Sequence, residues 1–184
     1  MSKRVLTVRN MVLAAMFAAL LAIGGQIRIP LEPVPITLQT LVVMLTGSIL
    51  GARIGAISMI VFILLVAFGA PILSGGAGGL GALLGPTGGY VLSWPLAVWV
   101  IGWLTERAPK LRVWNLTLIH LLGGVLLVYA AGVTWLAYVA GLGWKVAVLQ
   151  GALPFIAGDV AKAVVASIVT LGVIRAYPAI RPRK

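Results

Sequence analysis

Residues 151–175 read GALPFIAGDVAKAVVASIVTLGVIR, an apolar run that is interrupted by Asp159 and Lys162. The run is long enough to cross a bilayer, where a charged side chain costs roughly 2.5–3.5 kcal/mol on insertion scales. Residues three apart share one face of a helix, so this acid and this base can meet or hold one polar ligand together. We therefore expect the functional site around this pair.

The apolar character of this run extends along all 184 residues. Hydrophobic residues make up 61% of the chain and charged residues 9%, and the mean hydropathy is +1.14. A soluble domain of this size does not need so much apolar sequence. The pattern predicts an all-α integral membrane protein, a compact single-domain bundle of six transmembrane helices spanning 1–184. The expected helices cover about residues 10–27, 37–50, 56–71, 90–105, 114–138 and 151–175.

Basic residues are divided unequally between the two ends of these helices. With the N-terminus inside, the inner segments hold eleven lysines and arginines, against two, Arg28 and Lys145, outside. Cytoplasmic loops carry an excess of such residues, so both termini are expected in the cytoplasm. The net charge of +11 then reflects topology and not binding of nucleic acid. The eleven are Lys3, Arg4, Arg9, Arg53, Arg107, Lys110, Arg112, Arg175, Arg181, Arg183 and Lys184.

Few residues are available for metal or redox chemistry. The chain has no cysteine, so neither a disulfide nor a thiolate metal site can form. His120 is the single histidine and Asp159 the single carboxylate within an expected helix, so no metal site is expected. His120 is interpreted as a buried histidine whose polar atoms are satisfied, with no assigned role.

Two unusual segments fall outside the membrane in this topology. Residues 28–40 hold three prolines within six positions, which predicts a stiff, extended lid. Residues 71–81 are rich in glycine and lead into a second glycine-rich block at 85–90. Glycine allows backbone N–H groups to approach a ligand closely, which makes Gly76 and Gly78 candidate contacts. A flexible loop without contacts is the alternative, and a phosphate cradle is disfavoured because the Gly-x-x-x-x-Gly-Lys-Ser/Thr pattern is absent.

The acid–base pair is expected on the side of these two segments. Asp159 lies about eight residues from the outer end of the last helix, roughly 12 Å deep at 1.5 Å per residue. An outward-facing cavity with a polar floor follows as a hypothesis. The alternative is a structural ion pair, although such pairs are often no more stabilising than apolar replacements.

Three motifs in order resemble one known family. They are the segment Pro33-Val34-Pro35-Ile36-Thr37-Leu38-Gln39-Thr40-Leu41, the glycine block 75–79 with Gly85-Pro86-Thr87-Gly88-Gly89-Tyr90, and Pro154-Phe155-x-x-Gly158-Asp159-x-x-Lys162. Together they resemble BioY, the biotin-specific S-component of energy-coupling factor (ECF) transporters. The resemblance runs from the first expected helix to the last.

This resemblance implies a biotin-binding subunit of a vitamin uptake system in the plasma membrane of a prokaryote, and not an enzyme. The partners that it implies are a transmembrane coupling protein and two ATP-binding subunits. Biotin would be the transported ligand, and no cofactor is expected. The chain has no P-loop of its own, so ATP hydrolysis would belong to those partners.

The chemistry of biotin suits the charged pair. Ionised Asp159 can only accept hydrogen bonds and matches a ureido N–H, whereas Lys162 can only donate, to the ureido oxygen or to the tail carboxylate. Further candidate ligand contacts are Gln39, Thr37, Tyr90 and Thr87. Thr37 and Gln39 could instead cap the second helix, and Tyr90 could be an interfacial anchor.

Small residues recur at a spacing of four in the first helix, at Ala14 with Ala18 and at Ala15 with Ala19. Such residues let another helix approach closely in lipid. In the resembled family an alanine motif on this helix docks the coupling protein, and Ala14 and Ala18 are placed at that position. Packing within the same bundle is the alternative.

Two other function classes remain open at this point. A membrane enzyme could use the charged pair on a lipid or isoprenoid head group, and would turn over substrate as a purified chain. A proton-driven secondary carrier would take up its substrate in vesicles without ATP, although inverted repeats, a common carrier signature, are not evident.

Overall fold

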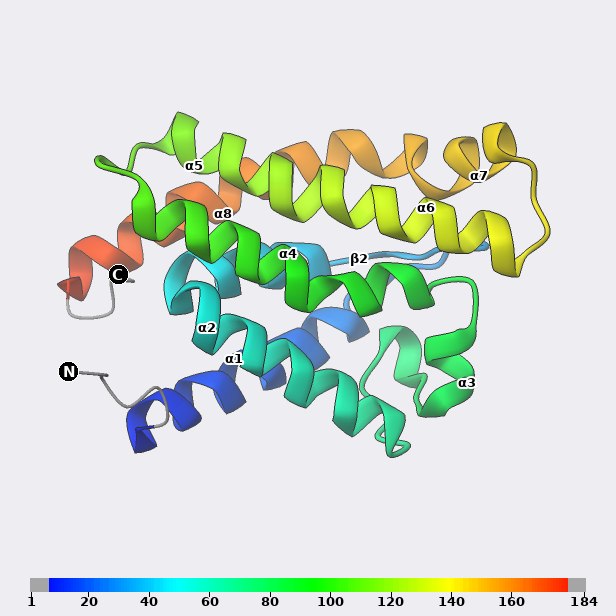
Figure 1. Ribbon diagram of the computed structural model, residues 1–184, viewed down its shortest axis with the longest axis horizontal. Helices are drawn as coiled ribbons and strands as arrows, with labels where there is room; N and C mark the ends of the chain where they lie inside the picture. Colours follow the sequence, from blue (N-terminus) through cyan, green and yellow to red (C-terminus); the bar gives the residue numbers. More distant parts are fainter. Residues whose placement is uncertain (1–6, 179–184) are drawn as a thin grey trace.

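The computed structural model describes residues 7–178, in which successive helical segments run back and forth along the long axis (Figure 1). Five segments of that range are long and apolar enough to cross a membrane. Their bounds are Val8–Gln26, Gln39–Ala67, Gly88–Arg107, Val113–Val139 and Trp144–Ala176. The basic residues Lys3, Arg4, Arg181, Arg183 and Lys184, which entered the prediction of orientation, lie outside the described residues.

The two expected helices 37–50 and 56–71 form two arms of one helical segment, α2 (Gln39–Ala67), with no loop between them. At Gly51 the backbone has φ 79° and ψ 179°, and the chain reverses there (Figure 1). A positive φ is open to glycine at little cost, and this turn therefore depends on the residue type. Glu106 completes it by accepting a hydrogen bond, 2.8 Å long, from the backbone N–H of Ala52 at the start of the second arm.

The other expected helices differ from the structure chiefly at their ends. The first is α1 (Val8–Gln26), and the fourth is α4 (Gly88–Arg107). The expected helix 151–175 corresponds to a 3₁₀ turn η3 (Leu153–Phe155) and α8 (Ile156–Ala176), and the short helix before it, α7 (Trp144–Gly151), was not predicted. Proline disfavours a helical conformation in the residue before it, so Pro154 accounts for the break between α7 and α8.

The expected helix 114–138 is continuous but not regular. It consists of α5 (Val113–His120), a π-helical segment η2 (Leu121–Leu127) and α6 (Val128–Val139). Two glycines of η2 lie where a Cβ would press into neighbouring side chains, Gly123 against Ile101 and Gly124 against Met44. The extra width of the π turn is therefore accommodated by close packing on α4 and α2.

The connecting segments gather at one end of the bundle. The expected lid is a short antiparallel hairpin, β1 (Arg28–Ile29) and β2 (Ile36–Thr37), and its strands were not predicted. The glycine-rich segment holds a 3₁₀ turn η1 (Ser74–Gly76) and a short helix α3 (Gly79–Leu84). Figure 1 shows this hairpin, α3 and α7 at one end, and the start of α1 and the end of α8 at the other.

The outer faces of the bundle are apolar, as expected for a chain surrounded by lipid. Large apolar side chains point outwards along the long helices, for example Ile23, 58% exposed, and Ile168, 56% exposed. Buried hydroxyls of the long helices bond to the backbone or to one another, as Ser48 does with Thr170 at 2.7 Å. The long apolar helices and their exposed apolar side chains indicate a multi-pass membrane protein.

Candidate functional site

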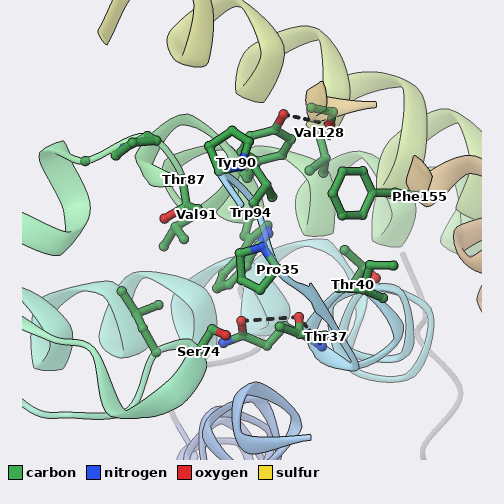
Figure 2. A pocket seen from close by; sticks show the side chains of 18 of the residues that line it. Pro35, Thr37, Thr40, Ser74, Thr87, Tyr90, Val91, Trp94, Val128 and Phe155 are labelled. Carbon is green, nitrogen blue, oxygen red and sulfur yellow. Dashed lines mark hydrogen bonds between the residues drawn. The ribbon is translucent and has the colours of Figure 1, made fainter. Parts of the chain in front are cut away.

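A cavity of about 360 Å³ opens at the end of the bundle that carries the hairpin and the glycine-rich segment. This volume lies within the range of roughly 300–1,000 Å³ that is typical of small-molecule sites. Its walls come from the proline-rich hairpin, the glycine-rich segment and the helices α2, α4, α6 and α8. Figure 2 shows Tyr90 and Phe155 on one side of the open space and Ser74 and Thr37 on the other.

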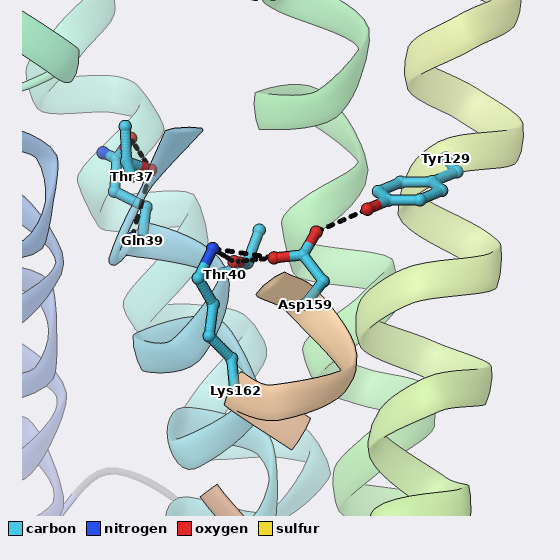
Figure 3. A network of polar contacts seen from close by, with 6 residues as sticks. All are labelled: Thr37, Gln39, Thr40, Tyr129, Asp159 and Lys162. Atoms are coloured by element: carbon cyan, nitrogen blue, oxygen red, sulfur yellow. Dashed lines mark hydrogen bonds and ion pairs between the residues drawn. The ribbon is translucent and has the colours of Figure 1, made fainter. Parts of the chain in front are cut away.

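Asp159 and Lys162 meet in the wall of this cavity, one turn apart on α8 (Figure 3). Lys162 Nζ lies 2.7 Å from Asp159 Oδ1, and the Asp159 residue is 3% exposed. The Thr40 hydroxyl, from α2, donates to the same carboxylate oxygen at 2.9 Å. The Tyr129 hydroxyl, from α6, donates to the other oxygen, Oδ2, at 2.6 Å. Three helices thus meet at one carboxylate.

Both charged groups keep some hydrogen-bonding capacity. Nζ of Lys162 donates to Asp159 and, at 3.1 Å, to the Thr40 hydroxyl, which uses two of its three N–H groups. Oδ2 of Asp159 accepts one bond, from Tyr129, and retains a free lone pair. The pair is therefore a structural anchor between helices and can also bind a polar ligand.

Thr37 and Gln39 line the cavity at the junction of β2 and α2, where Thr37 ends the strand and Gln39 is the first helical residue. The Thr37 hydroxyl accepts a bond from the backbone N–H of Gln39 at 3.2 Å and donates to its side-chain oxygen at 3.4 Å. The side-chain nitrogen of Gln39 is buried without a hydrogen-bond partner. A buried donor of this kind is costly unless something accepts from it, so its position in a cavity wall favours a ligand acceptor there.

Tyr90 and Thr87, at the start of α4, are also in the wall. Tyr90 is 9% exposed, and its hydroxyl donates to the backbone oxygen of Gly151 at 2.8 Å, tying α4 to α7. It therefore presents its ring to the cavity and is not an interfacial anchor. Gly132 of α6 lies against that ring so closely that a Cβ would overlap it.

Gly76 and Gly78 are not in the cavity wall, in contrast to the expectation for this segment. Gly76 has a positive φ of 77° and supports the turn, whereas a Cβ on Gly78 would overlap the backbone oxygen of Ala70. Their neighbours Ser74 and Ala77 are the wall residues. The glycines allow the segment to fold tightly enough to bring those two into place.

Several wall residues escaped the sequence analysis. Thr40 belongs to the quoted proline motif but was assigned no role, and Tyr129 carries no local signal because it is 30 residues from its partner Asp159. Trp94, one turn after Tyr90 on α4, has a buried ring nitrogen without a partner. Phe155 adds a second aromatic wall next to the polar floor.

The alanine pairs of α1 face in different directions. Ala14 is 8% and Ala18 6% exposed, and the Ala14 backbone oxygen accepts a bond of 2.7 Å from Ser58 of α2. Ala14 and Ala18, the positions predicted for docking, therefore pack inside the bundle and have little surface left for a partner. Ala15 and Ala19, which have the same spacing, are exposed.

His120 is fully buried in α5, as expected. Its Nδ1 lies 3.0 Å from the Ser167 hydroxyl and 3.2 Å from the Ala163 backbone oxygen, both on α8. Its Nε2 has no hydrogen-bond partner, so only half of the ring is satisfied. The contact joins α5 to α8 away from the cavity, whose wall does not include His120.

Comparison with known proteins places the chain in a family. The family model described as BioY matches residues 1–179. A biotin transporter BioY from Rhizobium etli is 42% identical over 97% of this chain and 100% of its own length. A probable biotin transporter BioY from Bacillus subtilis is 38% identical over 91% of each chain. A crystal structure of the S-component for biotin from an ECF-type ABC transporter matches with a TM-score of 0.86 and 31% identity, over 91% of this chain and 92% of that one. This chain belongs to the BioY family.

Proposed function

We propose that this chain captures biotin at the outer face of a prokaryotic plasma membrane, as the S-component of an ECF-type uptake system. The single observation that carries the proposal is the cavity, in which one charged pair stands in an otherwise mostly apolar wall. Biotin has the matching form, with a polar ureido group fused to an apolar ring system. The relatives named as biotin transporters agree with this choice of ligand.

The polar floor suits the ureido group. The free lone pair on Asp159 Oδ2 would accept from a ureido N–H, and the remaining N–H of Lys162 would donate to the ureido oxygen. Hydrogen bonds with a charged partner are about twice as strong as neutral ones, so this end of the ligand would be strongly anchored. Trp94 and Phe155 would cover the apolar rings of the ligand.

Energy for uptake would come from a coupling protein and two ATP-binding subunits, with both termini of this chain in the cytoplasm. The exposed face of α1 is the proposed contact for the coupling protein. On that face Ala15 and Ala19 are small and exposed, between exposed Val12, Met16 and Ile23. A partner helix could approach closely over the two alanines.

Calorimetry of the detergent-purified chain tests the ligand assignment. Biotin should bind, and desthiobiotin should bind as well, because it keeps the ureido group that the charged pair recognises. A purified chain that binds neither would contradict the proposal. Turnover of a lipid substrate would instead support a membrane enzyme, and uptake into vesicles that needs a proton gradient but no ATP would support a carrier.

A further inference from the structure

Arg28 lies at the mouth of the cavity and has no role in the site described so far. It is in β1, directly opposite Thr37 in β2. Both residues of β2, Ile36 and Thr37, are wall residues, so Arg28 lies on the strand that is paired with the cavity wall.

The guanidinium of Arg28 extends from the hairpin to the glycine-rich segment. A Cβ built on Gly75 would overlap the guanidinium carbon and its terminal nitrogens, so this charged group rests on the backbone at Gly75. Gly75 has a positive φ of 67° and directly follows Ser74, a wall residue. The charge is therefore one residue away from the cavity wall.

Nothing in the described part of the chain neutralises this charge. Within residues 7–178 no ion pair includes Arg28, and Glu32 of the same hairpin makes none with it. The neighbouring Ser74 hydroxyl is buried without a hydrogen-bond partner. A free guanidinium and a free hydroxyl thus stand together at the mouth, and both can donate to an anion.

The cation on the cavity floor is in a different situation. Lys162 already forms an ion pair with Asp159 and a hydrogen bond to Thr40. It is the only basic residue in the described cavity wall. A ligand with one neutral polar end and one carboxylate therefore meets a neutralised pair on the floor and an unpaired cation at the mouth.

We propose that Arg28 determines specificity by holding the carboxylate of the ligand at the mouth, with the Ser74 hydroxyl as a second donor. The planar guanidinium fits a carboxylate through two parallel N–H bonds. This inference rests on the proposed function and fixes the orientation of biotin, with the ureido group on the floor and the valerate tail at the mouth. Lys162 then serves the ureido oxygen and not the tail.

The test compares biotin with biotin amide, which has the same length but no charge, on the purified full chain by calorimetry. Arg28→Ala should raise the Kd for biotin at least about tenfold, because it removes a hydrogen bond to a charged group. The Kd for the amide should stay within a factor of about three, so the preference of the wild type for biotin disappears. Arg28→Lys keeps the charge but loses the planar fork, and should fall between the two.

Lys145→Ala is the matched control, since it removes an exposed positive charge from the same end of the molecule. It should change neither Kd. If Arg28→Ala raised the Kd for biotin and the Kd for biotin amide by the same factor, the proposal would be overturned. The residue would then act only as a link between the hairpin and the glycine-rich segment. A preserved preference for biotin in that variant would overturn it as well. A wild-type chain that binds neither ligand would refute the proposed function itself.

Discussion

Replacing Asp159 by asparagine keeps the shape of the side chain and removes its charge. In the structure this carboxylate accepts from Lys162, Thr40 and Tyr129. The amide can keep its oxygen toward Lys162 and Thr40, but it then presents an NH₂ group where Oδ2 was. A ligand N–H that bonds to Oδ2 loses a charged acceptor worth about 1.5–3 kcal/mol, so the Kd for biotin should rise roughly 10- to 150-fold.

Lys162→Met separates the effect on binding from the effect on folding. It leaves a buried carboxylate with only two neutral donors, and breaking a buried pair costs about 3–5 kcal/mol. The double variant Asp159→Asn/Lys162→Met removes both charges and should regain part of this stability without regaining affinity. Thermal unfolding in detergent measures the first quantity and calorimetry with biotin the second. A folded double variant that binds biotin as tightly as the wild type would refute the assigned floor of the site.

Three further changes test the wall and the docking face. Tyr129→Phe removes one donor to the charged pair but keeps the ring, so unfolding should become easier by about 1–3 kcal/mol in chemical denaturation. Gly132→Ala should push the Tyr90 ring out of place, at a cost of roughly 1–3 kcal/mol and with weaker biotin binding. Gly172→Ala, a helical glycine with open space around it, is its control and should leave binding unchanged. Ala15→Trp should abolish ATP-driven uptake in vesicles and leave binding to the purified chain intact. Normal co-purification of this variant with a complete ATPase module would count against docking on that face.

The sequence predicted the site best where a residue type has a high free-energy cost in lipid. Asp159 and Lys162 stood out because charge within an apolar run needs a reason, and both are in the cavity wall. The all-helical class followed from apolar length in the same way. Thr37 and Gln39 could be picked out from the sequence because they follow a segment whose conformation proline restricts, and both line the cavity. In each case the signal was local.

The features that were missed depend on tertiary contacts. Nothing near Gly51 in the sequence indicates that the chain reverses at that residue without a loop, since the turn depends on capping by Glu106 of α4. Ala14 is buried and Ala15 is exposed, but the four-residue spacing is the same for both and so cannot predict which of them faces outwards. Tyr129, the second residue of α6, reaches Asp159 because the preceding segment η2 packs on α8. Each of these features is determined by contacts with residues far away in the sequence.

The π-helical segment η2 has a geometric consequence for the two polar contacts on either side of it. His120 and Tyr129 are nine residues apart, which in a regular α-helix would set them roughly 180° apart, back to back. Both nevertheless face α8, one toward Ser167 and the other toward Asp159. A π turn takes up about one extra residue, which brings the angle between them to roughly 80°. The π turn thus rotates the second half of the helix relative to the first, so that one continuous helix directs two polar side chains toward α8.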